Sequence, residues 1–161
     1  MEPRRANGFT LIELLIVIAI IGILAAIAVP NLLAAVQRGK QKRTLGDMRA
    51  LATAIEAYHV DHGMFPAAGC APGSFVTLGT ELDASSFTAL SPTYIAQVPS
   101  RDGWGRFLYY RVDTGRSQYN VQSLGRDGGA DTVVCGTTTN FNDDIVYSNG
   151  TFVQWPEGSQ Q

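Results

Sequence analysis

The most strongly patterned part of the chain is its N-terminal third, where apolar positions first run together and then become periodic. Residues 9–29 read FTLIELLIVIAIIGILAAIAV, and only Thr10, Glu13 and Gly22 interrupt the apolar run. About 20 apolar residues are enough for a helix to cross the hydrocarbon layer of a bilayer. A secretory signal peptide would have a shorter apolar stretch, of about 7–15 residues, before a small-residue cleavage site. The run therefore predicts a membrane-spanning helix.

Beyond Pro30 the apolar positions become periodic. They recur every three to four residues, with charged residues between them, at Leu45, Met48, Leu51, Ile55 and Tyr58. This spacing predicts an amphipathic helix with one packed face. Gly63 and Pro66 supply its stop signal. If the helix is continuous from residue 9 to about residue 62, it is roughly 80 Å long at about 1.5 Å per residue.

The rest of the chain alternates turn signals with short strand-like runs. Residues 65–100 are rich in small and polar residues and are interpreted as an exposed connecting loop, with a short helix at 85–90. Strands are predicted at 106–112, 118–124, 144–147 and 151–153, with hairpin turns at 113–115 and 148–150. The predicted fold class is therefore α+β, with a long N-terminal helix packed on a small antiparallel sheet.

Composition and motifs exclude several classes of protein. The chain has 161 residues, 45% hydrophobic and 16% charged, which favours one folded domain over a disordered chain. A formal net charge of −2 argues against a nucleic-acid partner. The sequence contains no recognisable catalytic motif, so no enzymatic activity is expected. His59 and His62 are interpreted as solvated helix-end residues, because no third metal ligand lies nearby.

Glu13 is the one ionisable residue inside the apolar run. A charged side chain near the middle of a membrane helix costs roughly 2.5–3.5 kcal/mol on insertion scales unless it is paired. Glu13 is therefore expected to reach the interface, to be protonated, or to meet a cation on a new terminus or another subunit. Arg4 and Arg5 precede the run, and by the positive-inside rule they predict a cytoplasmic N-terminus and an external C-terminal region.

Residues 5–33, RANG-FTLIELLIVIAIIGILAAIAVPNLL, resemble the N-terminus of type IV pilins and pseudopilins. In that family a basic leader ends in a glycine, here Gly8, and a prepilin peptidase cuts after it on the cytoplasmic side. The next residue, here Phe9, becomes the N-methylated mature terminus, and the glutamate four residues later, here Glu13, is the assembly residue. The resemblance implies a leader (1–8), a transmembrane and filament-core helix (9–33), an amphipathic helix (34–63) and a globular loop and sheet region (64–161).

Cleavage after Gly8 would create the missing cation, an α-amine at Phe9. In a stacked filament Glu13 of one subunit could neutralise this amine on a neighbour and remove two unpaired charges from an apolar interior.

A second resemblance covers residues 98–145. VPSRDGWGRFLYY, followed by YNVQSLGRDGG and NDDIV, resembles the C-terminal region of the major pseudopilin of type II secretion systems. The stretch 103–105 has Gly where Pro is usual in that pattern, and residues 130–141 look like an insertion.

Cys70 and Cys135 are the only two cysteines. Both fall in loop-like sequence expected outside the membrane, where a disulfide is permitted. We expect a Cys70–Cys135 bond; the alternative is two buried free thiols.

A calcium site is expected between Leu124 and Asp144. Three carboxylates, those of Asp127, Asp143 and Asp144, fall in loops flanking a predicted strand, and Ca²⁺ prefers such oxygen ligands. The resemblance to the major pseudopilin implies Asp127, one or both of Asp143 and Asp144, and the Leu124 carbonyl as ligands. The alternative is a solvated acidic turn in which Asp127 caps its own glycine-rich loop.

The resemblances together imply a filament subunit of the pseudopilus of type II secretion, anchored by a single span in the bacterial inner membrane with its C-terminal domain in the periplasm. The implied partners are copies of itself, the prepilin peptidase, an inner-membrane assembly platform, and minor pseudopilins or pilins. One alternative is a type IV pilin for adhesion, motility or DNA uptake. Another is a signal-anchored ectodomain with enzymatic or receptor activity, which leaves the spacing of Gly8 and Glu13 unexplained.

Overall fold

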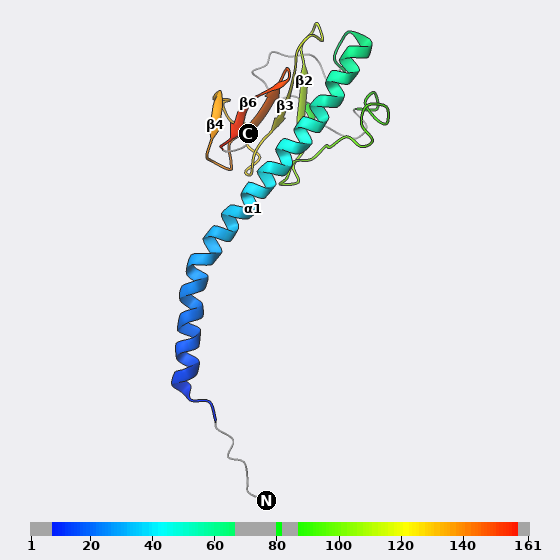
Figure 1. Cartoon of the computed structure of the whole chain (residues 1–161). Coiled ribbons are helices and arrows are strands. Elements are labelled where there is room, and N and C mark those ends of the chain that lie inside the picture. Colours follow the sequence, from blue (N-terminus) through cyan, green and yellow to red (C-terminus); the bar gives the residue numbers. More distant parts are fainter. Residues whose placement is uncertain (1–7, 67–79, 82–86, 158–161) are drawn as a thin grey trace, which may run out of the picture. The chain divides into compact units, whose positions relative to one another are not determined.

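The computed structural model describes residues 8–66, 80–81 and 87–157, and the chain divides into two compact units, Met1–Gln37 and Arg38–Gln161. The predicted long helix is confirmed: α1 (Leu11–His62) contains 52 residues (Figure 1). Pro30 lies inside α1 without ending it. The helix ends where expected, because the Gly63 N–H bonds the His59 carbonyl at 2.8 Å and Gly63 has a φ of 68°.

The sheet of the second unit has the strand order β1-β2-β3-β5-β6-β4 in the described part of the chain. Its strands are β1 (Thr80–Glu81), β2 (Tyr109–Val112), β3 (Tyr119–Ser123), β4 (Gly136–Thr138), β5 (Ile145–Ser148) and β6 (Thr151–Pro156). The pairs from β1 through to β6 are antiparallel, and the Asn149-Gly150 turn between β5 and β6 has the positive φ values of a tight hairpin. The α+β fold class and the four predicted strand regions are confirmed.

Strand β4 corrects the prediction of a purely antiparallel sheet. It lies within residues 130–141, which the sequence analysis treated as an insertion, and it pairs with β6 in parallel. Its sequence, Gly-Thr-Thr, has neither the alternation nor the apolar residues that identify a strand. The pairing depends instead on distant groups: the Val134 N–H donates to the Gln154 side chain at 2.6 Å, and the Glu157 N–H donates to the Thr138 carbonyl at 2.9 Å.

The core of the second unit lies between the C-terminal half of α1 and the sheet. Buried side chains of the helix and the strands form one cluster that includes Met48, Leu51, Ile55, Tyr110, Val121 and Ile145. The predicted exposed loop at 65–100 also contributes to it, so that prediction is wrong where the structure describes the segment. Phe65, Phe87 and Leu90 are buried, and the Tyr110 hydroxyl donates to the Pro66 carbonyl at 3.1 Å. Scattered apolar residues in a loop carry no period that would reveal their burial.

The predicted short helix at 85–90 is also wrong in its described part. Residues 87–94 form successive turns, with the Leu90 N–H bonding the Phe87 carbonyl at 3.0 Å. Pro92 has no N–H to continue a helical ladder and disfavours helical geometry at Ser91.

A loop before β2 fixes the helix to the sheet. The Gly103 N–H donates to the Thr44 hydroxyl oxygen at 2.9 Å, and the Thr44 hydroxyl donates to the Lys40 carbonyl at 3.0 Å. The adjacent Asp102 is 2% exposed, and its carboxylate accepts the Trp104 and Arg106 N–H groups and the Ser123 hydroxyl. These bonds satisfy a buried charge while they join the loop to α1 and β3.

The close approach of this loop gives the first prediction. A Cβ at Gly103 would overlap the backbone of Lys40, which cannot move without distorting α1. Gly103→Ala is therefore expected to lower the free energy of unfolding by about 1–3 kcal/mol. Thermal and denaturant unfolding of the full chain in detergent measure the change.

Gly46→Ala is the matched control, because Gly46 is an exposed α1 residue with nothing within 4 Å of its added Cβ. It is expected to raise stability by about 0.5–1 kcal/mol through helix propensity. Equal stability of Gly103→Ala and the wild type would contradict the proposed close contact.

Candidate functional site

The first candidate site is the N-terminal end of α1, where Thr10 and Glu13 cap each other. The Thr10 N–H and hydroxyl donate to Glu13 Oε2 at 2.9 and 2.7 Å, and the Glu13 N–H donates to Thr10 Oγ1 at 3.3 Å. This reciprocal pattern is a capping box, which satisfies helix donors that have no partner within the helix. The sequence analysis missed it, although Thr-x-x-Glu before an apolar run is its signature.

Glu13 has hydrogen-bond donors but no nearby cation on its helix. The next basic residue along α1 is Arg38, which lies 25 residues further on, at the start of the second unit. Gly8 and Phe9 are exposed, and open space surrounds Gly8. Cleavage between these two residues and the pairing of Glu13 with a neighbour's amine stay predictions.

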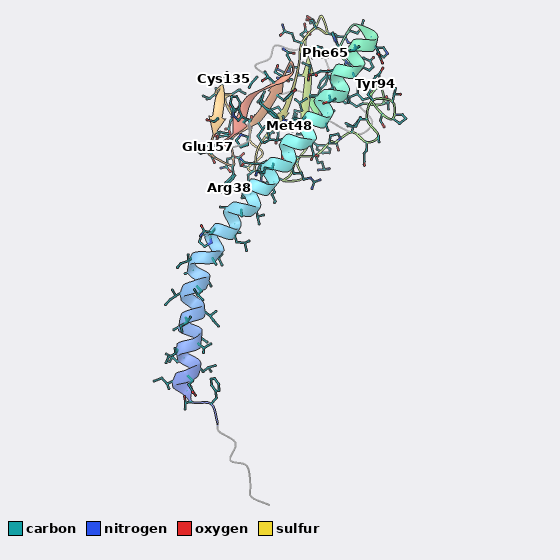
Figure 2. The ribbon with its side chains drawn as sticks, viewed as in Figure 1. Arg38, Met48, Phe65, Tyr94, Cys135 and Glu157 are labelled. Atoms are coloured by element: carbon teal, nitrogen blue, oxygen red, sulfur yellow. The ribbon has the colours of Figure 1, made fainter. Side chains whose placement is uncertain are left out.

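The apolar surface of the first unit is exposed all round the helix. Figure 2 shows side chains projecting from every side of this stretch, and Leu14, Ile18 and Ile27 are 58%, 60% and 64% exposed. Among the described residues one helix, α1, is long and apolar enough to cross a membrane, with a mean hydropathy of 3.0 in its most apolar window. Asn31 lies within the apolar stretch, and its amide donates to the Ile27 carbonyl at 3.1 Å. The first unit therefore fits a single-pass membrane anchor.

The second candidate site is the acidic region around Asp144. This side chain is fully buried, and its Oδ2 accepts the Gln122 amide at 2.7 Å and the Asp131 N–H at 3.1 Å. Its Oδ1 is buried without a hydrogen-bond partner in the described part of the chain. Burial raises the pKa of Asp144 to about 6. An unsatisfied buried carboxylate oxygen is costly, and it indicates a position where a cation or water would be stabilising.

The other predicted calcium ligands already make hydrogen bonds within their loops. The Leu124 carbonyl accepts the Gly128 N–H at 3.1 Å, and Asp127 Oδ1 accepts the Gly129 N–H at 3.0 Å, as in the alternative of a self-capped turn. Asp143 accepts the Thr138 hydroxyl and the Asn140 amide. Within the described ranges no three acidic, histidine or cysteine side chains are grouped as a metal site. The calcium site stays a prediction.

A cavity of about 680 Å³ lies beside this region, and its wall contains three carboxylates, those of Asp127, Asp131 and Asp143. The negative charges of Asp131 and Asp127 add to the effect of burial in raising the pKa of Asp144. Asp131 is a carboxylate that the sequence analysis missed, because it falls in the segment interpreted as an insertion.

The cysteines and histidines occupy separate places. Cys135 is exposed beside β4 (Figure 2) and has no disulfide partner among the described residues. Cys70 lies outside those residues, so the Cys70–Cys135 bond stays a prediction. The ring of His59 stacks on Phe65 at 4.2 Å between centroids, and that of His62 stacks on Tyr58 at 4.0 Å.

Two family models match the chain. Residues 3–29 match the prokaryotic N-terminal methylation motif, which contains Gly8, Phe9 and Glu13. Residues 31–140 match the model of type II secretion system protein G, which covers more than half of the chain.

Individual relatives agree with these models. The chain is 32% identical to the type II secretion system core protein G of Vibrio cholerae over 79% of this chain and 85% of the relative. It is 33% identical to the protein of the same name in Aeromonas hydrophila, over 82% of this chain and 91% of the relative. It is also 33% identical to the type II secretion system core protein G of Escherichia coli K12, over 77% of this chain and 84% of the relative. The resemblance to pseudopilins is thus confirmed, and the chain belongs to the type II secretion system protein G family.

Proposed function

We propose that the chain is a structural subunit of the pseudopilus, the helical filament of type II protein secretion. The observation that carries the proposal is the exposed apolar surface of the first unit. This surface begins at Glu13, whose carboxylate bonds Thr10 and which lies in the segment that matches the N-terminal methylation motif. Such a surface requires lipid or other copies of itself. The names of the relatives favour this role over that of a type IV pilin for adhesion, motility or DNA uptake.

In this proposal the subunit waits in the bacterial inner membrane with its N-terminus cytoplasmic and its C-terminal domain periplasmic. The prepilin peptidase removes residues 1–8, and an inner-membrane assembly platform adds the mature subunit to a filament that minor pseudopilins begin. The role is mechanical and requires no catalytic residue in this chain.

Glu13 selects the filament over the bilayer in this mechanism. Thr10 holds the carboxylate at the end of α1 next to Phe9, whose amine is free after cleavage. Thr10 supplies hydrogen bonds but no positive charge, so the carboxylate can still accept an ammonium group from a neighbouring subunit. A charge-assisted bond of this kind is stronger than a neutral one.

We also propose that Ca²⁺ binds beside Asp144. The unpartnered Oδ1 and the carboxylates of Asp127, Asp131 and Asp143 would supply the hard oxygen ligands that this ion prefers. Asp127, Asp144 and the Leu124 carbonyl would hold the ion, with Asp143 or Asp131 as a further ligand. Binding would neutralise mutually repelling carboxylates and fix the loops around β4.

The processing proposal predicts cleavage between Gly8 and Phe9. Intact-mass measurement of membrane-extracted protein should show the loss of residues 1–8 and the gain of one methyl group. Gly8→Ala should still be processed, whereas Gly8→Val should accumulate as precursor, because a branched side chain obstructs access to the scissile bond. An intact leader in assembled filaments would contradict the proposal.

The assembly proposal predicts that Glu13→Val prevents filament formation and leaves the second unit folded. Loss of one partner of a buried charge pair costs about 3–5 kcal/mol, so filament yield should fall more than tenfold. The measurement is the sheared filament fraction from cells that express no wild-type subunit. Thr10→Ser is the matched control, since it keeps the hydroxyl that caps Glu13 and should assemble normally. Abundant Glu13→Val filaments would refute the proposed charge pair.

The calcium proposal predicts that Ca²⁺ raises the melting temperature of the full chain in detergent. At 100 times its dissociation constant the ion would add about 2.7 kcal/mol of stability. Asp127→Asn should abolish the shift. Asp131→Asn and Asp143→Asn, each made as a single variant, show which of these two carboxylates participates. Asp47→Asn on α1 is the control and should keep the full shift. Identical melting curves in millimolar Ca²⁺ and in excess chelator would exclude the site.

A further inference from the structure

Four basic residues are concentrated in α1 just beyond its apolar stretch. Arg38, Lys40, Lys42 and Arg43, here called the basic collar, fall within six residues at the start of the second unit. Three of them are exposed and Lys40 is half-buried. Successive helical positions are rotated by about 100°, so the collar presents positive charge around much of the helix. Figure 2 marks Arg38, its first member.

Little negative charge within the described chain balances the collar. Arg43 contacts Asp47 at 3.5 Å, and both side chains remain partly exposed. The other three cations have no carboxylate within ion-pair distance among the described residues. The collar is thus a surface with a net positive charge available to an anionic partner.

The spacing along α1 indicates what that partner is. Residues 14–37, a stretch of 24 positions, carry no ionisable side chain. They measure about 36 Å along a helix, slightly more than the roughly 30 Å of hydrocarbon in a bilayer, and a moderate tilt accommodates the difference. Glu13 and Arg38 then fall in the headgroup layers on opposite sides. The Asn31 amide, between them, bonds the Ile27 carbonyl of its own helix.

We propose that the basic collar binds the phosphate groups of anionic phospholipids in the leaflet on the side of the C-terminal domain. The inference rests on the proposed membrane-spanning state of the unassembled subunit. Residues 38–43 rise about 8 Å along the helix, which matches a headgroup layer of roughly 5–8 Å. Arginine binds phosphate with paired N–H donors, and lysine adds compact charge.

The charge distribution around the span supports this partner. The positive-inside rule predicts an external C-terminal domain only when Arg4 and Arg5 are counted alone, because four basic residues follow the span. The expected orientation therefore places the larger basic cluster on the external side. Removal of residues 1–8 also removes Arg4 and Arg5, which leaves the collar as the basic cluster flanking the span. Anionic headgroups supply the countercharge that the collar needs on that side. They would also hold the subunit in the membrane until assembly removes it.

The test measures which lipid gathers around the collar of the unassembled full chain. The protein is reconstituted in vesicles of equal phosphatidylglycerol and phosphatidylcholine at low salt, in a Trp155→Phe background that leaves Trp104 as the only tryptophan. Trp104 follows Gly103, whose N–H contacts Thr44 next to the collar. Energy transfer from Trp104 to pyrene on a phosphatidylglycerol acyl chain should exceed transfer to the same probe on phosphatidylcholine by several-fold. About 1 M salt should remove the difference.

Charge-changing and charge-preserving variants separate electrostatic binding from structural change. Arg38→Gln with Lys42→Gln should remove most of the several-fold preference for phosphatidylglycerol, since each juxtamembrane cation contributes about 1 kcal/mol. Arg38→Lys with Lys42→Arg is the matched control and should keep the preference. Circular dichroism verifies that both double variants are folded.

Equal transfer to the two probes in the wild type, or an unchanged preference in the glutamine variant, would overturn the proposal. The collar could instead bind the acidic domain of a second copy. In that case the glutamine variant would reduce energy transfer between two subunits that carry a donor and an acceptor label, and it would leave the lipid preference unchanged. That result would also overturn the lipid proposal. A negative result in the vesicle measurement would not contradict the proposed filament role, because that measurement involves no filament. The assembly of Glu13→Val tests the filament role separately.

Discussion

The rest of the molecule depends on one constraint: the first half of α1 exposes apolar side chains that no described part of the chain covers. In water this surface would be highly unfavourable, so its partner must be lipid or the same helix in other copies. Lipid tails and leucine side chains are about equally apolar, so transfer from bilayer to filament gains little hydrophobic free energy. The groups that can distinguish the two environments are therefore the polar and charged ones at the ends of the apolar stretch.

The second unit meets a different requirement: its sheet and loops must stay attached to the C-terminal part of α1. Its core is modest, and the helix is fixed by a buried polar network in addition to apolar contacts. Asp102 would be costly to bury alone, but four groups from its own loop, α1 and β3 satisfy the Asp102–Gly103 segment. A satisfied polar network of this kind accepts only one position of the loop along α1, whereas apolar side chains tolerate small sliding movements.

The sequence could predict the parts of the fold that depend on local pattern. Helix α1, its end at Gly63 and the Asn149-Gly150 turn each follow from residues next to one another, and each is confirmed. Strand β4 and the buried Phe87 depend on contacts with residues far away in the chain, and local period cannot report such contacts. At the candidate sites, Gly8, Phe9 and Glu13 came from a recognisable motif. Thr10 belongs to a Thr-x-x-Glu capping signature that the sequence contains but the prediction omitted. Asp131 could not be predicted from local pattern, because only folding places its N–H against the Asp144 carboxylate.

In the two proposals, the ends of the apolar stretch have opposite energetic consequences. The Glu13 carboxylate would gain a countercharge when another subunit presents its amine, so this end would favour the filament. The basic residues that begin at Arg38 would gain countercharges at a membrane surface, so this end would favour the bilayer. The apolar side chains between them contribute nearly equally to both states. A subunit with these two proposed interactions would be stable in the membrane alone and would leave it only where a neighbouring terminus is correctly placed, which would restrict polymerisation to the growing end of a filament.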